Sequence, residues 1–101
     1  MDDYLKLQYK LEDLLGMKHV HYQSPENLKM EYPAIRYSLD DIESRYANDA
    51  KYSMFNRYKI IVIDRLPDNE VIKKILALPH SSFDRRYVSN GLYHDVIILY
   101  Y

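Results

Sequence analysis

Apolar residues recur at helical spacing in two segments of the chain. In the first segment, residues 2–15, they form a single stripe that Gly16 ends. The second segment opens at Pro67 and closes at Pro79, and Asp68 is its expected N-cap. The pattern predicts two amphipathic helices, whose apolar stripes consist of Tyr4, Leu7, Leu11, Leu14 and Leu15 and of Val71, Ile72, Ile75 and Leu76.

Further segments have the apolar pattern of β-strands. Pro33 is tolerated at the start of one of them, and residues 60–63 are apolar on both faces, as in the centre of a covered sheet. Asn90 and Gly91 stand between two strand-like runs and predict a type I′ hairpin. The expected strands are residues 19–23, 32–38, 54–65, 83–89 and 92–101.

These segments together predict one α+β domain over residues 1–101, with the order α-β-β-β-α-β-β. We expect an N-terminal helix and a mainly antiparallel sheet of four to five strands, with the second helix packed on the sheet. A strand over residues 54–65 spans about 40 Å, but a domain of this size is only about 34 Å across. Its polar half is therefore expected to leave the core as part of a projecting β-hairpin arm, unless the strand twists or bends enough to fit inside.

The polar stretch over residues 40–53 is expected to be a long loop at the end of this arm. Long loops in small domains are usually either functional or disordered. Partner contact and a mobile, functionally silent loop therefore both remain open.

The last expected strand is the second candidate contact surface. Residues 97–101 are apolar on both faces and contain no Lys, Glu or Pro. A bare sheet edge of this kind would aggregate, so it must be covered. Either a central position in the sheet or a neighbouring subunit would cover it.

Composition narrows the choice of function. The net charge is −1, with 14 basic and 15 acidic residues interspersed, which argues against nucleic acid as the main partner. The absence of cysteine excludes disulfides and thiolate metal sites. The longest apolar run is too short for a bilayer and the N-terminus is acidic, so we expect a cytosolic protein without membrane partners. The 12 tyrosines suit strand positions, and they also suit surfaces that become buried on assembly.

Residues with catalytic or metal-binding side chains are few. His19 and His21 share a strand face and could bind a metal, although satisfied or exposed histidines are the plainer interpretation. Asp40, Asp41 and Glu43 could act as acid and base or chelate a hard cation, but a solvated acidic loop is by far the plainer account of them. We therefore expect no catalytic residue, no metal and no cofactor.

The segment after the second helix offers the residue types of a hydrolase triad. His80, Ser81, Ser82 and Asp84 lie close together in sequence, but a triad is defined by geometry and no nucleophile elbow is present. With only two glycines, the chain also has no glycine-rich phosphate loop.

Several short motifs together carry a resemblance. They are Tyr32-Pro-Ala-Ile-Arg-Tyr37, Tyr46-Ala-Asn-Asp-Ala-Lys-Tyr52 and the strand Arg57-Tyr-Lys-Ile-Ile-Val-Ile-Asp64. Leu78-Pro-His-Ser-Ser-Phe-Asp-Arg-Arg-Tyr87 and Leu92-Tyr-His-Asp95 follow in the same order. In this order and spacing, roughly residues 30–101 resemble the tail-terminator, or tail-completion, proteins of long-tailed bacteriophages.

The resemblance implies a virion assembly protein, found at the tail–neck junction and in the host cytoplasm during assembly. It implies a hexameric ring of this chain that caps the tail tube and contacts the tail tube protein and the head-tail connector or stopper. DNA would pass through the ring without sequence-specific recognition. The implied contacts are Asp40, Asp41, Glu43, Arg45, Tyr46, Asp49 and Tyr52 on the arm loop, and Ile98, Tyr100 and Tyr101 between neighbouring subunits.

Two other classes of function remain as alternatives. One is a small non-enzymatic adaptor or regulatory module that acts as a monomer or dimer. The other is a metal-dependent hydrolase or nuclease that uses the acidic residues at 40, 41 and 43.

Overall fold

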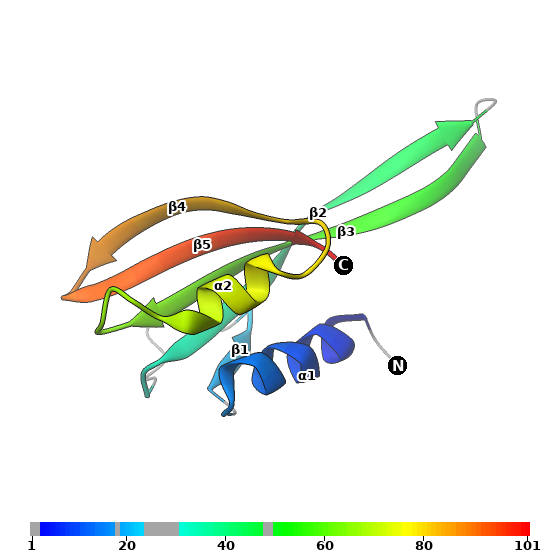
Figure 1. The fold of residues 1–101 in the computed structure, drawn as a ribbon. Coiled ribbons are helices and arrows are strands. Elements are labelled where there is room, and N and C mark those ends of the chain that lie inside the picture. Colours follow the sequence, from blue (N-terminus) through cyan, green and yellow to red (C-terminus); the bar gives the residue numbers. More distant parts are fainter. Residues whose placement is uncertain (1–2, 18, 24–30, 48–49) are drawn as a thin grey trace.

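The computed structural model describes residues 3–17, 19–23, 31–47 and 50–101; for residue 3 and the described residues among 43–55 it describes the backbone alone. The order of elements is α-β-β-β-α-β-β (Figure 1), which confirms the predicted α+β fold class. The elements are α1 (Asp3–Leu15), β1 (Val20–Tyr22), β2 (Ala34–Ala47), β3 (Ala50–Asp64), α2 (Glu70–Leu76), β4 (Ser81–Ser89) and β5 (Leu92–Tyr100).

The strands form one five-stranded sheet in the order β1-β2-β3-β5-β4. The pairing of β1 with β2 is parallel, and the other three pairings are antiparallel, as predicted for a mainly antiparallel sheet. Ile60 of β3 pairs with Tyr37 on one side and with Ile97 on the other, so the apolar half of β3 lies at the centre of the sheet.

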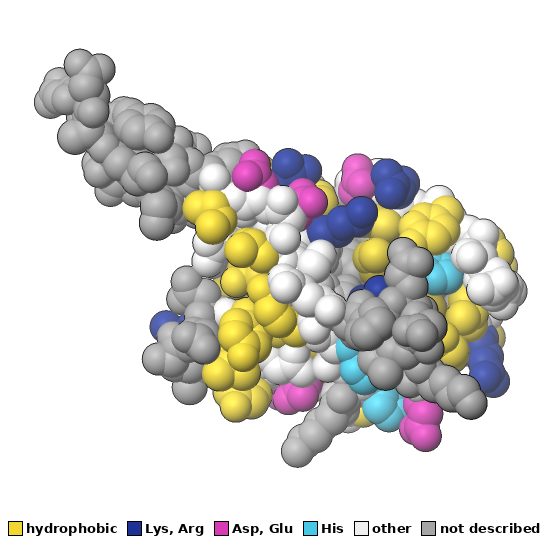
Figure 2. All heavy atoms as spheres, turned by 180° about the vertical axis from the view of Figure 1, so that it is seen from behind, with side chains coloured by type: hydrophobic (Ala, Val, Ile, Leu, Met, Phe, Trp, Pro, Cys, Tyr) yellow, Lys and Arg dark blue, Asp and Glu magenta, His cyan; other side chains and the backbone are white. Residues whose placement is uncertain are grey.

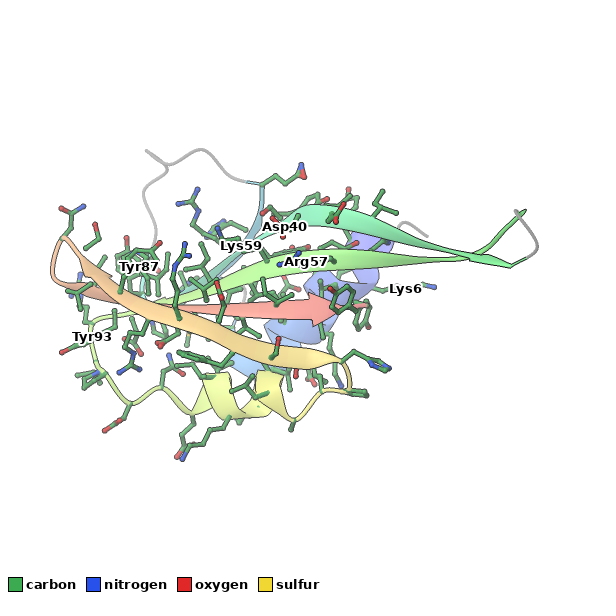
Figure 3. The ribbon with its side chains drawn as sticks, turned by 90° about the horizontal axis from the view of Figure 1, so that it is seen from above. Lys6, Asp40, Arg57, Lys59, Tyr87 and Tyr93 are labelled. Atoms are coloured by element: carbon green, nitrogen blue, oxygen red, sulfur yellow. The ribbon has the colours of Figure 1, made fainter. Side chains whose placement is uncertain are left out.

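Both helices pack on the same face of the sheet and leave its opposite face without a helix (Figures 1 and 3). Leu7 and Leu11 of α1 and Ile75 of α2 are fully buried against this face. The predicted apolar stripes of both helices therefore point into the core. The core cluster comprises Leu7, Leu11, Val20, Ile35, Tyr37, Tyr58, Ile60, Val62, Val71, Ile75, Ile97 and Leu99.

The ends of the helices follow local chemistry. Gly16 has a φ of 79°, and its N–H donates to the Glu12 carbonyl oxygen at 2.9 Å, which ends α1 as predicted. The predicted N-cap of α2, Asp68, is wrong. The cap is Asn69, whose side-chain oxygen accepts from the Val71 N–H at 2.9 Å. Asp64 at the end of β3 accepts a hydrogen bond from the Asn69 side-chain amide at 2.7 Å, which fixes Asn69 in this role.

The projecting arm is a two-stranded ribbon. The pairing of β3 with β5 ends at Arg57, whereas β2 and β3 remain paired from Asp41↔Arg57 out to Ala47↔Ala50. The ribbon projects from the body (Figure 1), and the whole molecule extends over 50 × 26 × 24 Å.

The predicted loop over residues 40–53 is wrong in extent. Residues 40–47 and 50–53 are strand, and the connection at residues 48–49 lies outside the described residues. The backbones of β2 and β3 stay paired along this stretch, although no apolar alternation in the sequence marks it as strand.

The last strand is not a sheet edge. β5 lies between β3 and β4, and this central position accounts for its apolar residues on both faces. Of the two ways in which this strand could be covered, the structure shows the central position, because β4 lies on its outer side. A contact of Ile98, Tyr100 and Tyr101 with a neighbouring subunit stays a prediction. At the β4–β5 turn, Asn90 and Gly91 have φ values of 53° and 74°, as the predicted type I′ hairpin requires.

Candidate interaction surfaces

The base of the arm holds the first two predicted contact residues. Asp40 is the extra residue of a β-bulge, since Leu39 pairs with Tyr58 while Asp41 pairs with Arg57. Asp40 Oδ2 lies 3.3 Å from the Arg57 Nε. That nitrogen is buried and makes no well-aligned hydrogen bond, so the ion pair is its partner. Asp41 Oδ1 accepts from the Ile42 N–H at 2.8 Å. Both carboxylates are thus engaged locally where the arm leaves the sheet.

The remaining predicted contact residues lie further along the arm. Glu43, Arg45 and Tyr46 belong to β2 and are paired with β3, while Tyr52 is the extra residue at a second irregularity between the two strands. Asp49 lies outside the described residues. The structure therefore places the described members of this set on one ribbon, at strand positions instead of loop positions.

The candidate metal ligands are not brought together. Among the side chains that the structure describes, no three histidine or carboxylate groups converge as a metal site would require. His19 Nε2 lies 3.3 Å from a Glu31 carboxylate oxygen, and its Nδ1 lies 3.3 Å from the Pro33 carbonyl oxygen. Burial first, and then the neighbouring His19 and Arg36, lower the pKa of His21. His19 is thus held by local polar contacts and not by a metal-binding arrangement.

The residues that resembled a hydrolase triad have structural roles. The Ser81 hydroxyl donates to the Leu78 carbonyl oxygen at 2.7 Å, and the His80 carbonyl accepts from the Tyr100 N–H at 3.1 Å. Asp84 is the extra residue of a bulge between Phe83 and Arg85. These contacts join α2 to β4 and β4 to β5, and they do not assemble a nucleophile with a base.

The exposed edge strand β4 is a surface that the sequence did not reveal. β4 pairs only with β5 among the described strands, and its residues 82–89 are exposed. Phe83, Tyr87 and Val88 are large apolar side chains on this strand, and Val88 is 61% exposed. An edge of this kind can accept an additional strand from a partner, because its outer N–H and C=O groups are unpaired.

A half-open groove of about 460 Å³ lies on the sheet face opposite the helices. Arg36 and Ser38 of β2, Lys59 and Ile61 of β3, and Tyr87 of β4 contribute to its lining. Figure 3 looks onto this face and shows Lys59 and Arg57 along β3. The signal in the sequence was the alternation of Arg57 and Lys59 with core residues, but the strand order was needed to see which cations share a face.

Comparison with known proteins adds no relative: no protein-family model and no curated protein matches this sequence. Neither helix in the described part of the chain combines the length and the apolar character that crossing a bilayer demands.

Proposed function

We propose that this chain is a non-enzymatic assembly protein of a long-tailed bacteriophage, which caps the tail tube as a ring and joins it to the head connector. The observation that carries the proposal is the paired β2–β3 ribbon that projects beyond the sheet. Two of the motifs that resemble tail-completion proteins fall at opposite ends of this hairpin. The Tyr-Pro motif of residues 32–37 enters β2 at the body, and the motif of residues 46–52 spans the outer end of the arm.

A ring of identical subunits requires two different surfaces on each subunit that fit each other. We assign these two roles to the arm and to the edge of β4, which pairs with no other described strand than β5. In the proposed hexamer these surfaces supply the contacts between subunits. The faces of the ring then contact the tail tube protein and the connector or stopper, in the virion at the tail–neck junction and in the host cytoplasm during assembly.

The edge of β4 also favours a second candidate function. Addition of one extended segment of another protein to this edge needs neither a ring nor the arm. A small adaptor or regulatory module, monomeric in solution, would use β4 in this way.

The solution mass, measured by light scattering over a wide concentration range, tests the ring. In the variant, Asn-Gly replaces residues 42–56, which joins the paired positions Asp41 and Arg57 by a two-residue turn and leaves the Asp40–Arg57 ion pair in place. We expect the full chain to form a closed oligomer as its concentration rises and the variant to remain a monomer that still unfolds cooperatively on heating.

Two outcomes would contradict the proposed ring or the role of the arm in it. A full chain that stays monomeric at every concentration contradicts a self-assembling ring and favours the adaptor. An oligomer that persists without the arm contradicts the role given to the ribbon.

A further inference from the structure

Cations gather on the sheet face that the helices leave uncovered. Tyr37, Tyr58 and Ile60 point to the helices, so the residues that alternate with them point to the opposite face. The basic side chains placed there by this alternation and by the strand register are Arg36 of β2, Arg57 and Lys59 of β3, Arg85 of β4 and His94 of β5.

Acidic side chains beside this group lie at its two ends. Asp40 pairs with Arg57 at 3.3 Å, and Asp84 lies 3.8 Å from Arg85. Among the described residues, no carboxylate lies within ion-pairing distance of Lys59 at the centre of the face. Figure 2 shows Lys and Arg side chains, with acidic ones beside some of them, along the border that runs away from the arm. A net charge of −1 therefore conceals a basic face.

The spacing of the two central cations suits a chain of phosphates. Arg36 pairs with Ile61, and Lys59 lies two residues before Ile61 on the same strand. Diagonal neighbours of this kind stand about 7–8 Å apart. Both line the groove together with Ser38, which adds a hydroxyl donor.

Aromatic side chains lie beside the cations. The rings of Tyr87 and His94 stack at 4.7 Å with an interplanar angle of 11°, and the Arg85 guanidinium lies 6.0 Å from the centre of the Tyr87 ring. Tyr87 also lines the groove. Surfaces that combine a groove of cations with aromatic faces are typical of nucleic-acid binding without sequence readout, because the cations follow the phosphate backbone and the rings can stack on unpaired bases.

We propose that this face, formed around Arg36, Lys59, Arg85 and Tyr87, binds the sugar–phosphate backbone of DNA without sequence specificity. The inference goes beyond the proposed ring, because the face lies within one subunit and needs no neighbour to complete it. In a ring through which DNA passes, it would give the subunit a contact with the genome in addition to its contacts with proteins.

The test is a fluorescence anisotropy titration of a DNA duplex of about 20 base pairs with the full chain at several salt concentrations. Contacts with three to four phosphates give a slope of about −3 for log K against log salt. The double variant Lys59→Gln with Arg85→Gln should weaken binding at least about tenfold and make the slope shallower by about 2. The matched control is Lys6→Gln with Lys10→Gln, which removes the same charge from exposed positions on α1 and should retain most of the affinity.

Three results would overturn the proposal. The first is no binding of the duplex at about 50 mM salt, where a phosphate contact surface is expected to act. The second is an equal loss of affinity in the control variant, which would reduce the effect to overall charge. The third is tighter binding of polyglutamate than of DNA, lost in the Lys59 and Arg85 double variant, which would assign the face to an acidic protein partner.

Discussion

At the scale of single residues, one polar group joins α1 to the sheet. The Tyr37 hydroxyl lies 2.7 Å from Gln8 Oε1 and 3.0 Å from the Tyr4 carbonyl oxygen, both acceptors on α1. The Gln8 amide in turn donates to the Val20 carbonyl oxygen and to Glu12. Tyrosine here supplies both a buried ring and a hydrogen bond, which explains its use at core positions where Phe would fill the same space.

Removal of this hydroxyl should destabilise the protein. Tyr37→Phe leaves Gln8 Oε1 without its donor in a half-buried site, and we expect a loss of about 1–2 kcal/mol in the free energy of unfolding. Urea unfolding followed by circular dichroism measures the loss. Tyr9→Phe is the control. Tyr9 lies on α1, as Gln8 does, and is 56% exposed, so loss of its hydroxyl should change the free energy of unfolding by less than about 0.5 kcal/mol. Equal stability of the two variants would contradict the role of the hydroxyl.

The same residue predicts a sensitivity to alkali. Burial first, and then the neighbouring Tyr22 and Tyr58, raise the pKa of Tyr37 above its ordinary value. Its contribution is therefore fully present below the unfolded pKa of about 10 and is lost as pH rises further, because the unfolded chain releases the proton first. Urea midpoints between pH 9 and 11 should fall more steeply for the natural chain than for Tyr37→Phe. Parallel curves would show that other groups govern alkaline unfolding.

At the scale of elements, an ion pair fastens β4 to the rest of the fold. Asp95 on β5 is 3% exposed, and its two carboxylate oxygens accept from Arg86 Nε at 2.6 Å and from an Arg86 terminal nitrogen at 3.2 Å. Arg86 also donates to the Pro67 carbonyl oxygen between β3 and α2. The pair therefore links the edge strand both to its neighbour in the sheet and to the connection that precedes α2.

Loss of the buried carboxylate should weaken this link. Asp95→Ala removes two hydrogen bonds from a buried position and should cost about 2 kcal/mol in the free energy of unfolding. Thermal and urea unfolding both report it. Asp84→Ala on the adjacent strand removes an ion pair that is 3.8 Å long and half exposed, and should cost less than about 0.5 kcal/mol. The interpretation fails if the two alanine variants are equally stable.

The elements also show what the sequence could predict. The turn at Asn90 and Gly91 was identified correctly, because both positions need positive φ and these residue types adopt it readily. The outer parts of β2 and β3 were mistaken for a loop, since the polar residues there show no apolar alternation that would mark a strand. The N-cap was predicted at Asp68 and not at Asn69, because the contact of Asn69 with Asp64 exists only after the chain folds.

At the scale of the whole molecule, the candidate surfaces depend on strand order. The sequence left open whether a central position or a neighbouring subunit covers the last strand, and the strand order places β5 between β3 and β4, with β4 at the edge. The cations at 36, at 57 and 59, and at 85 come from three different strands and share a face only through the pairing of β2, β3, β5 and β4. The edge position of β4 and the shared face of the cations could not be predicted from the sequence pattern. That pattern shows which residues of a strand lie on one face, but not which strands are neighbours.

A substitution on the edge of β4 tests assembly independently of the variant that lacks the arm. Val88→Lys places a charge on this edge and should abolish any concentration-dependent rise in solution mass, because charged side chains oppose pairing between edges. Leu66→Lys is the control: Leu66 is 65% exposed in the connection after β3, outside the sheet edge, and should leave the mass unchanged. Loss of assembly in both variants would indicate a general effect of charge.

The position of β5 also sets the order of events while the polypeptide emerges from the ribosome. β3 is synthesised before β5, which pairs with β3 on the side opposite β2. Until β5 arrives, the apolar strand around Ile60 and Val62 presents an open edge to other nascent chains. β4 cannot shield it, because β4 reaches the sheet only through β5. We therefore expect the folding chain to be most prone to aggregation while β3 is formed and β5 has not yet paired with it.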